Sequence, residues 1–305
     1  MYHNPVMLAE CLEGLNLKSD GVYVDATFGG GGHSRAILAH LGEQGRLLSF
    51  DQDADANHNA RFVEEKQFTF IDANFRHLKK YARLYAAPQV DGILADLGVS
   101  SHQFDTAERG FSTRFEANLD MRMNQRAGQT AQEVVNSYSA ADLHRIFGMY
   151  GEVQNAKTAG QAVYTARLNK SIETVNDLKN VLQRYAPRGK ENKYFAQIFQ
   201  ALRIEVNDEM GALEEFLAQA ADLLKPNGRL VVMSYHSLED RLVKNFINKG
   251  KFHGEVEKDL FGNNLKPLQA VTRKATEPSA AEVTQNPRAR SAKLRIAEKI
   301  SSLNP

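Results

Sequence analysis

The chain has 305 residues, 42% of them hydrophobic, and a formal net charge of +1 at pH 7. This is enough for one large domain or two ordinary ones with a buried core. The near-neutral charge neither supports nor excludes a nucleic-acid partner. No apolar run approaches the ~20 residues of a membrane span, and the first residues lack the pattern of a secretory leader. We therefore expect a cytoplasmic protein with no membrane partner.

The single cysteine excludes an intramolecular disulfide and a cysteine-rich zinc site, and no metal site is predicted. Cys11 lies among Leu8, Leu12 and Leu15 at helical spacing, which predicts a buried helix face.

Four consecutive glycines, residues 29–32, separate the apolar run Val22–Val24 from the start of a helical pattern that ends near Gly42. Glycine inside a regular element costs about 0.5–1 kcal/mol relative to alanine, so the run needs a local reason. A flexible turn is one interpretation. The other is a strand, glycine turn and helix that together bind a nucleotide-like cofactor.

Further apolar runs follow at intervals that suit alternating strands and helices. They cover residues 47–50 before Asp51, 68–71, 92–95 before Asp96, and 230–233. Continuous apolar runs are typical of parallel strands that are covered on both faces. The sequence therefore predicts an α/β fold with a doubly wound, Rossmann-like sheet.

Between Asp96 and Leu230 the pattern becomes helical. Capping signals at Thr130, Ser139 and Thr174 each precede apolar positions at helical spacing. We predict a helical insertion at 105–206 within a discontinuous domain of residues 1–104 and 207–305. Because the insertion follows the strand that ends at Asp96, we expect both of its ends to lie at the carboxyl edge of the sheet.

Two carboxylates discriminate between cofactors. Asp51 ends the second strand, where an acidic side chain accepts hydrogen bonds from the ribose hydroxyls of either NAD or S-adenosylmethionine. A dinucleotide fingerprint that starts at Gly30 fails at its third glycine, which is Arg35. Asp25 suits a cationic amino group or sulfonium better than a pyrophosphate. These residues favour S-adenosylmethionine.

Several blocks of the sequence resemble one known family. They are "DATFGGGGHS", "ILADLGVSSHQFD", "ERGFS", "LDMRM", "FQALRIEVN", "GRLVVMSYHSLEDRLVK" and "NPRARSAKLRIAEK". In this order they closely resemble the bacterial 16S ribosomal RNA cytosine-N4-methyltransferases over nearly the whole chain. Thr27 departs from the first loop glycine of many methyltransferases, and residues 251–274 are less recognisable.

The resemblance implies an S-adenosylmethionine-dependent enzyme that methylates a cytidine in the decoding region of 16S rRNA. We expect 16S rRNA within the small ribosomal subunit as its partner, with free 16S rRNA as the alternative substrate, and we expect the insertion at 105–206 to serve RNA recognition. It implies cofactor binding by Gly31, Gly32, His33, Asp51, Phe75, Asp96 and Gln103.

The chemistry of an exocyclic amine makes Asp96 the first candidate for a catalytic group. The amine lone pair is delocalised into the ring, so the enzyme must accept an N–H hydrogen bond and orient the nitrogen. "DLGV" stands where enzymes that methylate such amines commonly have a Pro-Pro-aromatic turn. His236 is the second candidate, as a base contact or proton relay. Ser237 with Asp240 forms a helix-capping signal just after it.

Cations at Arg288, Arg290, Lys293 and Arg295 are candidates for RNA contacts, although a solvated surface also explains such charges. Two other functions fit parts of the sequence. A nicotinamide oxidoreductase fits the glycine loop and Asp51, but not Arg35. A noncatalytic ribosome-assembly factor with a retained cofactor site fits every motif. The oligomeric state has no signal in the sequence.

Overall fold

The structure is a computed structural model that describes residues 5–301. Two compact units divide the chain. The sheet unit comprises the residues up to Gly98 and those from Met210 on, and the helical unit comprises Val99–Glu209. Val99 packs against the core of the helical unit, and Glu209 pairs with Arg203 at 2.7 Å. These contacts place the unit boundaries a few residues outside the 105–206 expected from the sequence.

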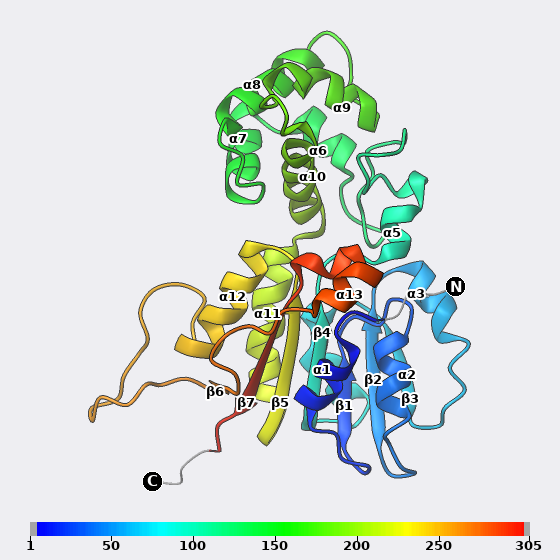
Figure 1. The fold of residues 1–305 in the computed structure, drawn as a ribbon, viewed down its shortest axis with the longest axis vertical. Coiled ribbons are helices and arrows are strands. Elements are labelled where there is room, and N and C mark those ends of the chain that lie inside the picture. The colour runs from blue at the N-terminus through cyan, green and yellow to red at the C-terminus, as the bar shows by residue number, and fades with distance from the viewer. Residues whose placement is uncertain (1–4, 302–305) are drawn as a thin grey trace. The chain divides into compact units, whose positions relative to one another are not determined.

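The sheet unit is built on seven strands in the order β3-β2-β1-β4-β5-β7-β6 (Figure 1). Their bounds are β1 Val22–Asp25, β2 Arg46–Asp51, β3 Phe68–Asp72, β4 Val90–Asp96, β5 Leu224–Ser234, β6 Leu268–Ala270 and β7 Lys293–Lys299. Strands β1 to β5 run parallel to one another. Because β1 has β2 on one side and β4 on the other, the winding reverses at β1, which is where such sheets bind ligands. The doubly wound α/β fold is confirmed.

The last two strands were not predicted. Strand β7 pairs antiparallel with β5, and β6 pairs antiparallel with β7. The run "KLRIAEK" alternates buried and exposed residues at its start, as an antiparallel strand does. In the sequence its charges indicated a basic surface instead.

Helices cover both faces of the sheet, and each face has its own core. Phe50 and Phe216 belong to one core, and Cys11 and Leu47 belong to the other. Cys11 is fully buried, as predicted. The helices are α1 Leu8–Leu15, α2 Gly32–Leu38, α3 Ala54–Ala60, α4 Leu78–Leu84, α11 Glu209–Leu223, α12 Ser237–Lys249 and α13 Ala280–Gln285, with 3-10 turns at Phe75–His77 and Pro287–Ser291.

The helical unit has a separate core that includes Phe147, Leu178 and Ile198. Its helices are α5 Ser101–Asp105, α6 Ala131–Ser137, α7 Ala140–Met149, α8 Ala156–Arg167, α9 Val175–Leu182 and α10 Glu191–Asn207, with 3-10 turns at Ala107–Arg109 and Gln183–Tyr185. The three predicted capping residues cap α6, α7 and α9 through their side chains. Among residues 5–301, none of the helices is long and apolar enough to cross a membrane.

Candidate active site

The glycine loop connects β1 to α2 and needs glycine for two reasons. Gly31 has a φ of +76°, in the left-handed region, and a Cβ there would lie 2.7 Å from the Phe28 ring. A Cβ on Gly32 would lie 2.4 Å from Pro5. By contrast, a Cβ on Gly29 would meet nothing within 4 Å, so the backbone there borders open space. The loop is therefore a fixed turn with one open backbone face.

Asp51 holds this loop from the end of β2. Its Oδ2 accepts the Gly29 N–H at 2.8 Å, and its Oδ1 accepts the Asp53 N–H at 2.9 Å. Burial raises the pKa of the Asp51 carboxyl to about 6. A carboxylate oxygen has two lone pairs, so each oxygen keeps capacity for one more donor, such as a ribose hydroxyl.

Asp25 ends β1, directly before the glycine loop, and is buried. Only 1% of the residue is exposed. Its carboxylate accepts the Ser34 hydroxyl at 2.6 Å and the Thr27 N–H at 3.1 Å, and burial raises its pKa. Asp25 thus fixes the ends of the loop, and its charge acts on the site from below.

Asp96 ends β4, beside β1, and is held on several sides. Its Oδ1 accepts the Tyr235 hydroxyl at 2.8 Å, and its backbone N–H donates to the Thr27 hydroxyl at 2.7 Å. The second interaction gives a reason for threonine, where many methyltransferases have the first loop glycine. The side chain is 23% exposed, and burial raises the pKa of the carboxyl to about 6.

His33, in the first turn of α2, faces Asp96. Its Nδ1 lies 3.9 Å from Asp96 Oδ2, and its Nε2 lies 3.1 Å from the Val6 carbonyl oxygen. A carbonyl oxygen only accepts, so Nε2 carries the hydrogen and Nδ1 is directed at the carboxylate. The ring is almost fully buried, with 7% of the side chain exposed. His33 and Asp96 therefore form a pair at the switch point of the sheet.

Phe75 and Gln103 were expected to complete the cofactor site. Phe75 starts the 3-10 turn after β3, is half-buried, and packs edge-on against Phe216 at 5.2 Å between ring centroids. Gln103 belongs to the helical unit, where its Oε1 accepts the Ser100 N–H in the capping box of α5.

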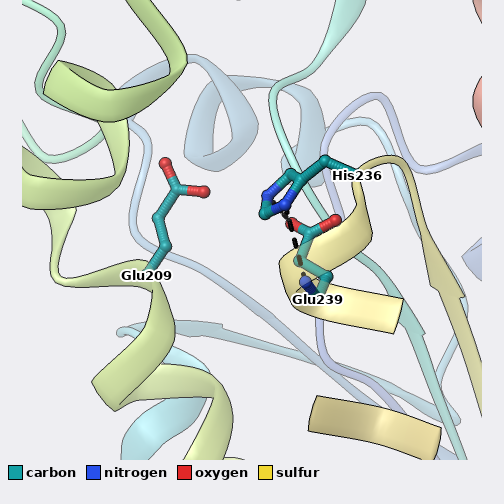
Figure 2. A group of neighbouring side chains, drawn as sticks. All are labelled: Glu209, His236 and Glu239. Carbon is teal, nitrogen blue, oxygen red and sulfur yellow. Dashed lines mark hydrogen bonds and ion pairs between the residues drawn. The ribbon is translucent and has the colours of Figure 1, made fainter. Parts of the chain in front are cut away.

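His236 caps the start of α12 and stands one residue before the cap that the sequence predicted. The sequence favoured Ser237 as the capping residue, and this was wrong: the His236 side chain accepts from the Glu239 N–H. Its Nε2 also lies 3.1 Å from Glu239 Oε1, and Figure 2 shows the ring above the first turn of the helix. Glu239 Oε2 in turn accepts the Tyr235 N–H at 2.9 Å. Both side chains thus shape the turn from β5 into α12.

The four predicted RNA-contacting cations separate into two kinds. Arg288, Arg290 and Lys293 are exposed. Arg295 instead forms a two-point ion pair with Asp240, at 2.7 and 3.1 Å, so its RNA contact stays a prediction. The alternation of β7 turns the Arg295 side chain toward α12, where the partly buried Asp240 carboxylate holds it.

The chemistry of these groups tests the cofactor expectation. Carboxylates end the three adjacent strands β1, β2 and β4, and the glycine loop leaves backbone open at Gly29. Clustered negative charge opposes a pyrophosphate and favours a cationic ligand. The residues present therefore fit S-adenosylmethionine, whose sulfonium and ammonium groups are positive.

Together, the switch-point site and the acidic strand ends define an α/β protein that binds a nucleoside cofactor of cationic character. Residues 1–300 match the family model described as the MraW methylase family. The chain belongs to this family of S-adenosylmethionine-dependent methylases, which confirms the cofactor and the enzyme class expected from the sequence.

Curated relatives are similar over almost their entire length. The chain is 58% identical to the ribosomal RNA small subunit methyltransferase H of Cytophaga hutchinsonii, covering 98% of this chain and 100% of the relative. It is 55% identical to the protein of that name from Parabacteroides distasonis, covering 98% of each. Among solved structures, an rRNA methylase from Streptococcus thermophilus matches with a TM-score of 0.39 and 14% identity, covering 99% of each chain.

Sequence reasoning missed three residues that build the site: Thr27, Tyr235 and Glu239. One available signal was position, because Tyr235 directly follows β5 and therefore lies at the same edge of the sheet as Asp96. The hydrogen bond of Thr27 to Asp96 joins residues 69 positions apart, which no spacing predicts. Glu239 contacts Tyr235 and His236, so its spacing at the start of α12 was a local signal that went unused.

Proposed function

We propose that this chain transfers the methyl group of S-adenosylmethionine to the exocyclic N4 of a cytidine in the decoding region of small-subunit (16S) ribosomal RNA. Membership of the MraW methylase family supports methyl transfer. The names of the full-length relatives support ribosomal RNA of the small subunit as the substrate. The proposal that the methylated atom is N4 of a cytidine is supported by the sequence resemblance and by the chemistry of the site.

The observation that carries the proposal is the Asp96 carboxylate. Tyr235 occupies its Oδ1 at 2.8 Å, whereas the partner found for Oδ2 within residues 5–301 is the Nδ1 of His33 at 3.9 Å. That distance is too long for a hydrogen bond, so Oδ2 keeps its acceptor capacity. A partly exposed acceptor of fixed orientation at the switch point is what a weakly nucleophilic amine requires.

When bound, S-adenosylmethionine supplies an electrophilic methyl group. We assign the ribose hydroxyls to Asp51, the backbone contacts to Gly31, Gly32 and His33, and the adenine to Phe75, with Gln103 added from the helical unit. Asp25 supports the loop from below. Asp96 Oδ2 accepts the amine hydrogen, and His236 acts as a positioning residue that fixes the turn after β5.

Methylation at N4 needs no covalent enzyme intermediate, whereas methylation at ring carbon C5 usually needs an accessible cysteine thiolate. Cys11 is the one cysteine of the sequence. It is fully buried on α1, and burial raises the pKa of its thiol well above the usual range. These facts favour direct attack by nitrogen on a base turned out of its stack.

We assign the RNA phosphates to exposed cations. In the sheet unit these are Arg288, Arg290 and Lys293. In the helical unit, Arg184, Arg188, Lys190 and Lys193 are exposed around the start of α10, which supports an RNA-recognition role for that unit. Such contacts add affinity that falls with salt and carries no sequence information.

Transfer of a labelled methyl group tests the proposal. The full chain is incubated with labelled S-adenosylmethionine and either free 16S rRNA or small-subunit particles that lack the modification. We expect label in at least one of the two RNAs and none with Asp96→Ala. A protein that binds the cofactor but labels neither substrate would instead be a noncatalytic assembly factor.

A further inference from the structure

Three titratable side chains act on one another at the ends of β1 and β4. Asp25 is buried beneath the glycine loop, His33 stands in the first turn of α2, and Asp96 ends β4. His33 lowers the pKa of both carboxyls, whereas burial raises both. His33 is thus the basic member of an otherwise acidic cluster. The other groups that act on Asp96 or on Cys11 beside it are Tyr235, Glu239, Glu10 and Glu282.

The Val6 carbonyl sets the tautomer of the His33 ring. It accepts from Nε2 of His33 at 3.1 Å, so the second ring nitrogen, Nδ1, points its lone pair or its proton at Asp96 Oδ2. At 3.9 Å, Nδ1 and Oδ2 are too far apart for a hydrogen bond, but they are close enough for the charge of one group to act on the other.

We infer that the His33–Asp96 pair releases a proton when S-adenosylmethionine binds, and then takes up the proton that the substrate amine loses. Only the second step of this inference, uptake of the proton from the substrate amine, rests on the proposed function. It assigns the His33 side chain a role in proton transfer, in addition to the backbone contact expected from the resemblance.

Charge conservation supports both steps, the proton release on cofactor binding and the proton uptake during methyl transfer. S-adenosylmethionine carries a net charge of about +1 at neutral pH, and a cation brought to a low-dielectric acidic cluster displaces a bound proton. In the transfer, the new N–C bond forms from the nitrogen lone pair as the methyl C–S bond breaks and leaves its electron pair on sulfur. The sulfonium charge disappears, and the amine proton moves to Asp96 Oδ2, which faces His33 Nδ1. The cluster therefore returns to its protonated state.

Calorimetry of cofactor binding tests the first step without any RNA. Binding heats measured in buffers of different ionisation enthalpy give the number of protons released. Because the Asp96 carboxyl has a pKa of about 6, we expect release of about half a proton per cofactor near pH 6 and almost none at pH 8.5. S-adenosylhomocysteine lacks the sulfonium charge and should release markedly less.

Three variants identify the source of the proton. Asp96→Asn should abolish most of the release. Asp91→Asn is the matched control, because Asp91 lies at the opposite end of the same strand and pairs with Lys18 and Lys225; its release should equal that of the wild type. His33→Gln keeps an N–H donor for Val6 but removes the group that lowers the Asp96 pKa, so the pH of maximal release should rise. A merely structural role of His33 would lower affinity and leave that pH unchanged.

The outcomes separate this inference from the proposed function. Cofactor binding with no proton release at pH 6, or equal release with S-adenosylhomocysteine, overturns the inference and leaves methyl transfer intact. Unchanged release in Asp96→Asn overturns it as well. No binding of S-adenosylmethionine at all would overturn both.

Discussion

Tyr235 donates its phenolic hydrogen to Oδ1 of Asp96 at 2.8 Å, which joins the ends of the adjacent parallel strands β4 and β5. The backbone N–H of Tyr235 is held in turn by Glu239 Oε2 at 2.9 Å. The start of α12 therefore fixes a tyrosine, and the tyrosine fixes which carboxylate oxygen of Asp96 remains for a substrate.

Tyr235→Phe should shift the acid limb of the methyl-transfer pH profile to higher pH. The Tyr235 hydrogen bond favours the charged carboxylate and lowers the Asp96 pKa, so its loss raises that pKa by a few tenths to about one unit. The carboxylate is the required acceptor, so activity is lost as the pH falls through a higher value. The rate of transfer at saturating substrates, measured from pH 5 to 8, gives the shift.

Tyr23→Phe is the matched control for this shift. Tyr23 is a fully buried tyrosine of the same unit, and its hydroxyl accepts from the Lys18 N–H away from Asp96. It should lower stability without moving the pH profile. An unmoved profile in Tyr235→Phe would contradict the role given to its hydroxyl.

Asp51→Ala should weaken S-adenosylmethionine binding by about 1–3 kcal/mol, through lost ribose hydrogen bonds and a loosened Gly29 turn. Calorimetry measures this directly. Asp72→Ala is the control, because Asp72 pairs in register with Asp51 at the end of the next strand but is exposed. Equal affinities of Asp51→Ala and the wild type would remove Asp51 from the cofactor site.

Arg290→Glu and Lys293→Glu should weaken RNA binding and reduce its salt dependence, because each removes a phosphate contact. Arg295→Ala should act differently. It breaks the ion pair with Asp240, which is 14% exposed, so thermal stability should fall while the salt dependence of binding stays unchanged. Filter binding at several salt concentrations, together with thermal melts, separates the two effects. A fall in salt dependence for Arg295→Ala would return that residue to the RNA surface.

The cofactor-free protein should lose stability as the pH rises from 5 to 7.5. Asp51 and Asp96 have folded-state pKa values of about 6, above the usual value near 4. Their contribution is therefore fully present at low pH and is lost as the pH rises through 6. We expect a decrease of about 1–3 kcal/mol in the free energy of unfolding, measured by urea denaturation followed by circular dichroism. Asp96→Asn should flatten the curve, and an equally steep curve would show that other groups cause it.

The sheet and the edge that holds the site were predictable, because parallel buried strands have continuous apolar sequences and their carboxyl ends meet at one edge. Asp51 and Asp96 could be placed there from the sequence for that reason. The three helix caps of the insertion were likewise local signals, and the structure confirms them.

The rest depended on contacts distant in sequence. The sequence placed Asp25 among the cofactor-binding residues, but it did not predict that this buried carboxylate accepts the Ser34 hydroxyl. The sequence indicated that Arg295 belongs to a basic surface, whereas in the structure β7 places its side chain against Asp240. The spacing of residues in the sequence does not show which of several nearby polar groups a side chain will bond. For the same reason the sequence predicted Ser237 as the cap of α12, whereas the structure has His236.

The position of the added methyl group tests the central claim most directly. Small-subunit RNA methylated by the wild-type chain and by Cys11→Ala is digested to nucleosides and compared with standards by mass spectrometry. We predict N4-methylcytidine from both proteins, with nearly equal rates, and none from Asp96→Ala. C5-methylcytidine as the product, or a folded Cys11→Ala protein without activity, would contradict direct methyl transfer to the amine at Asp96.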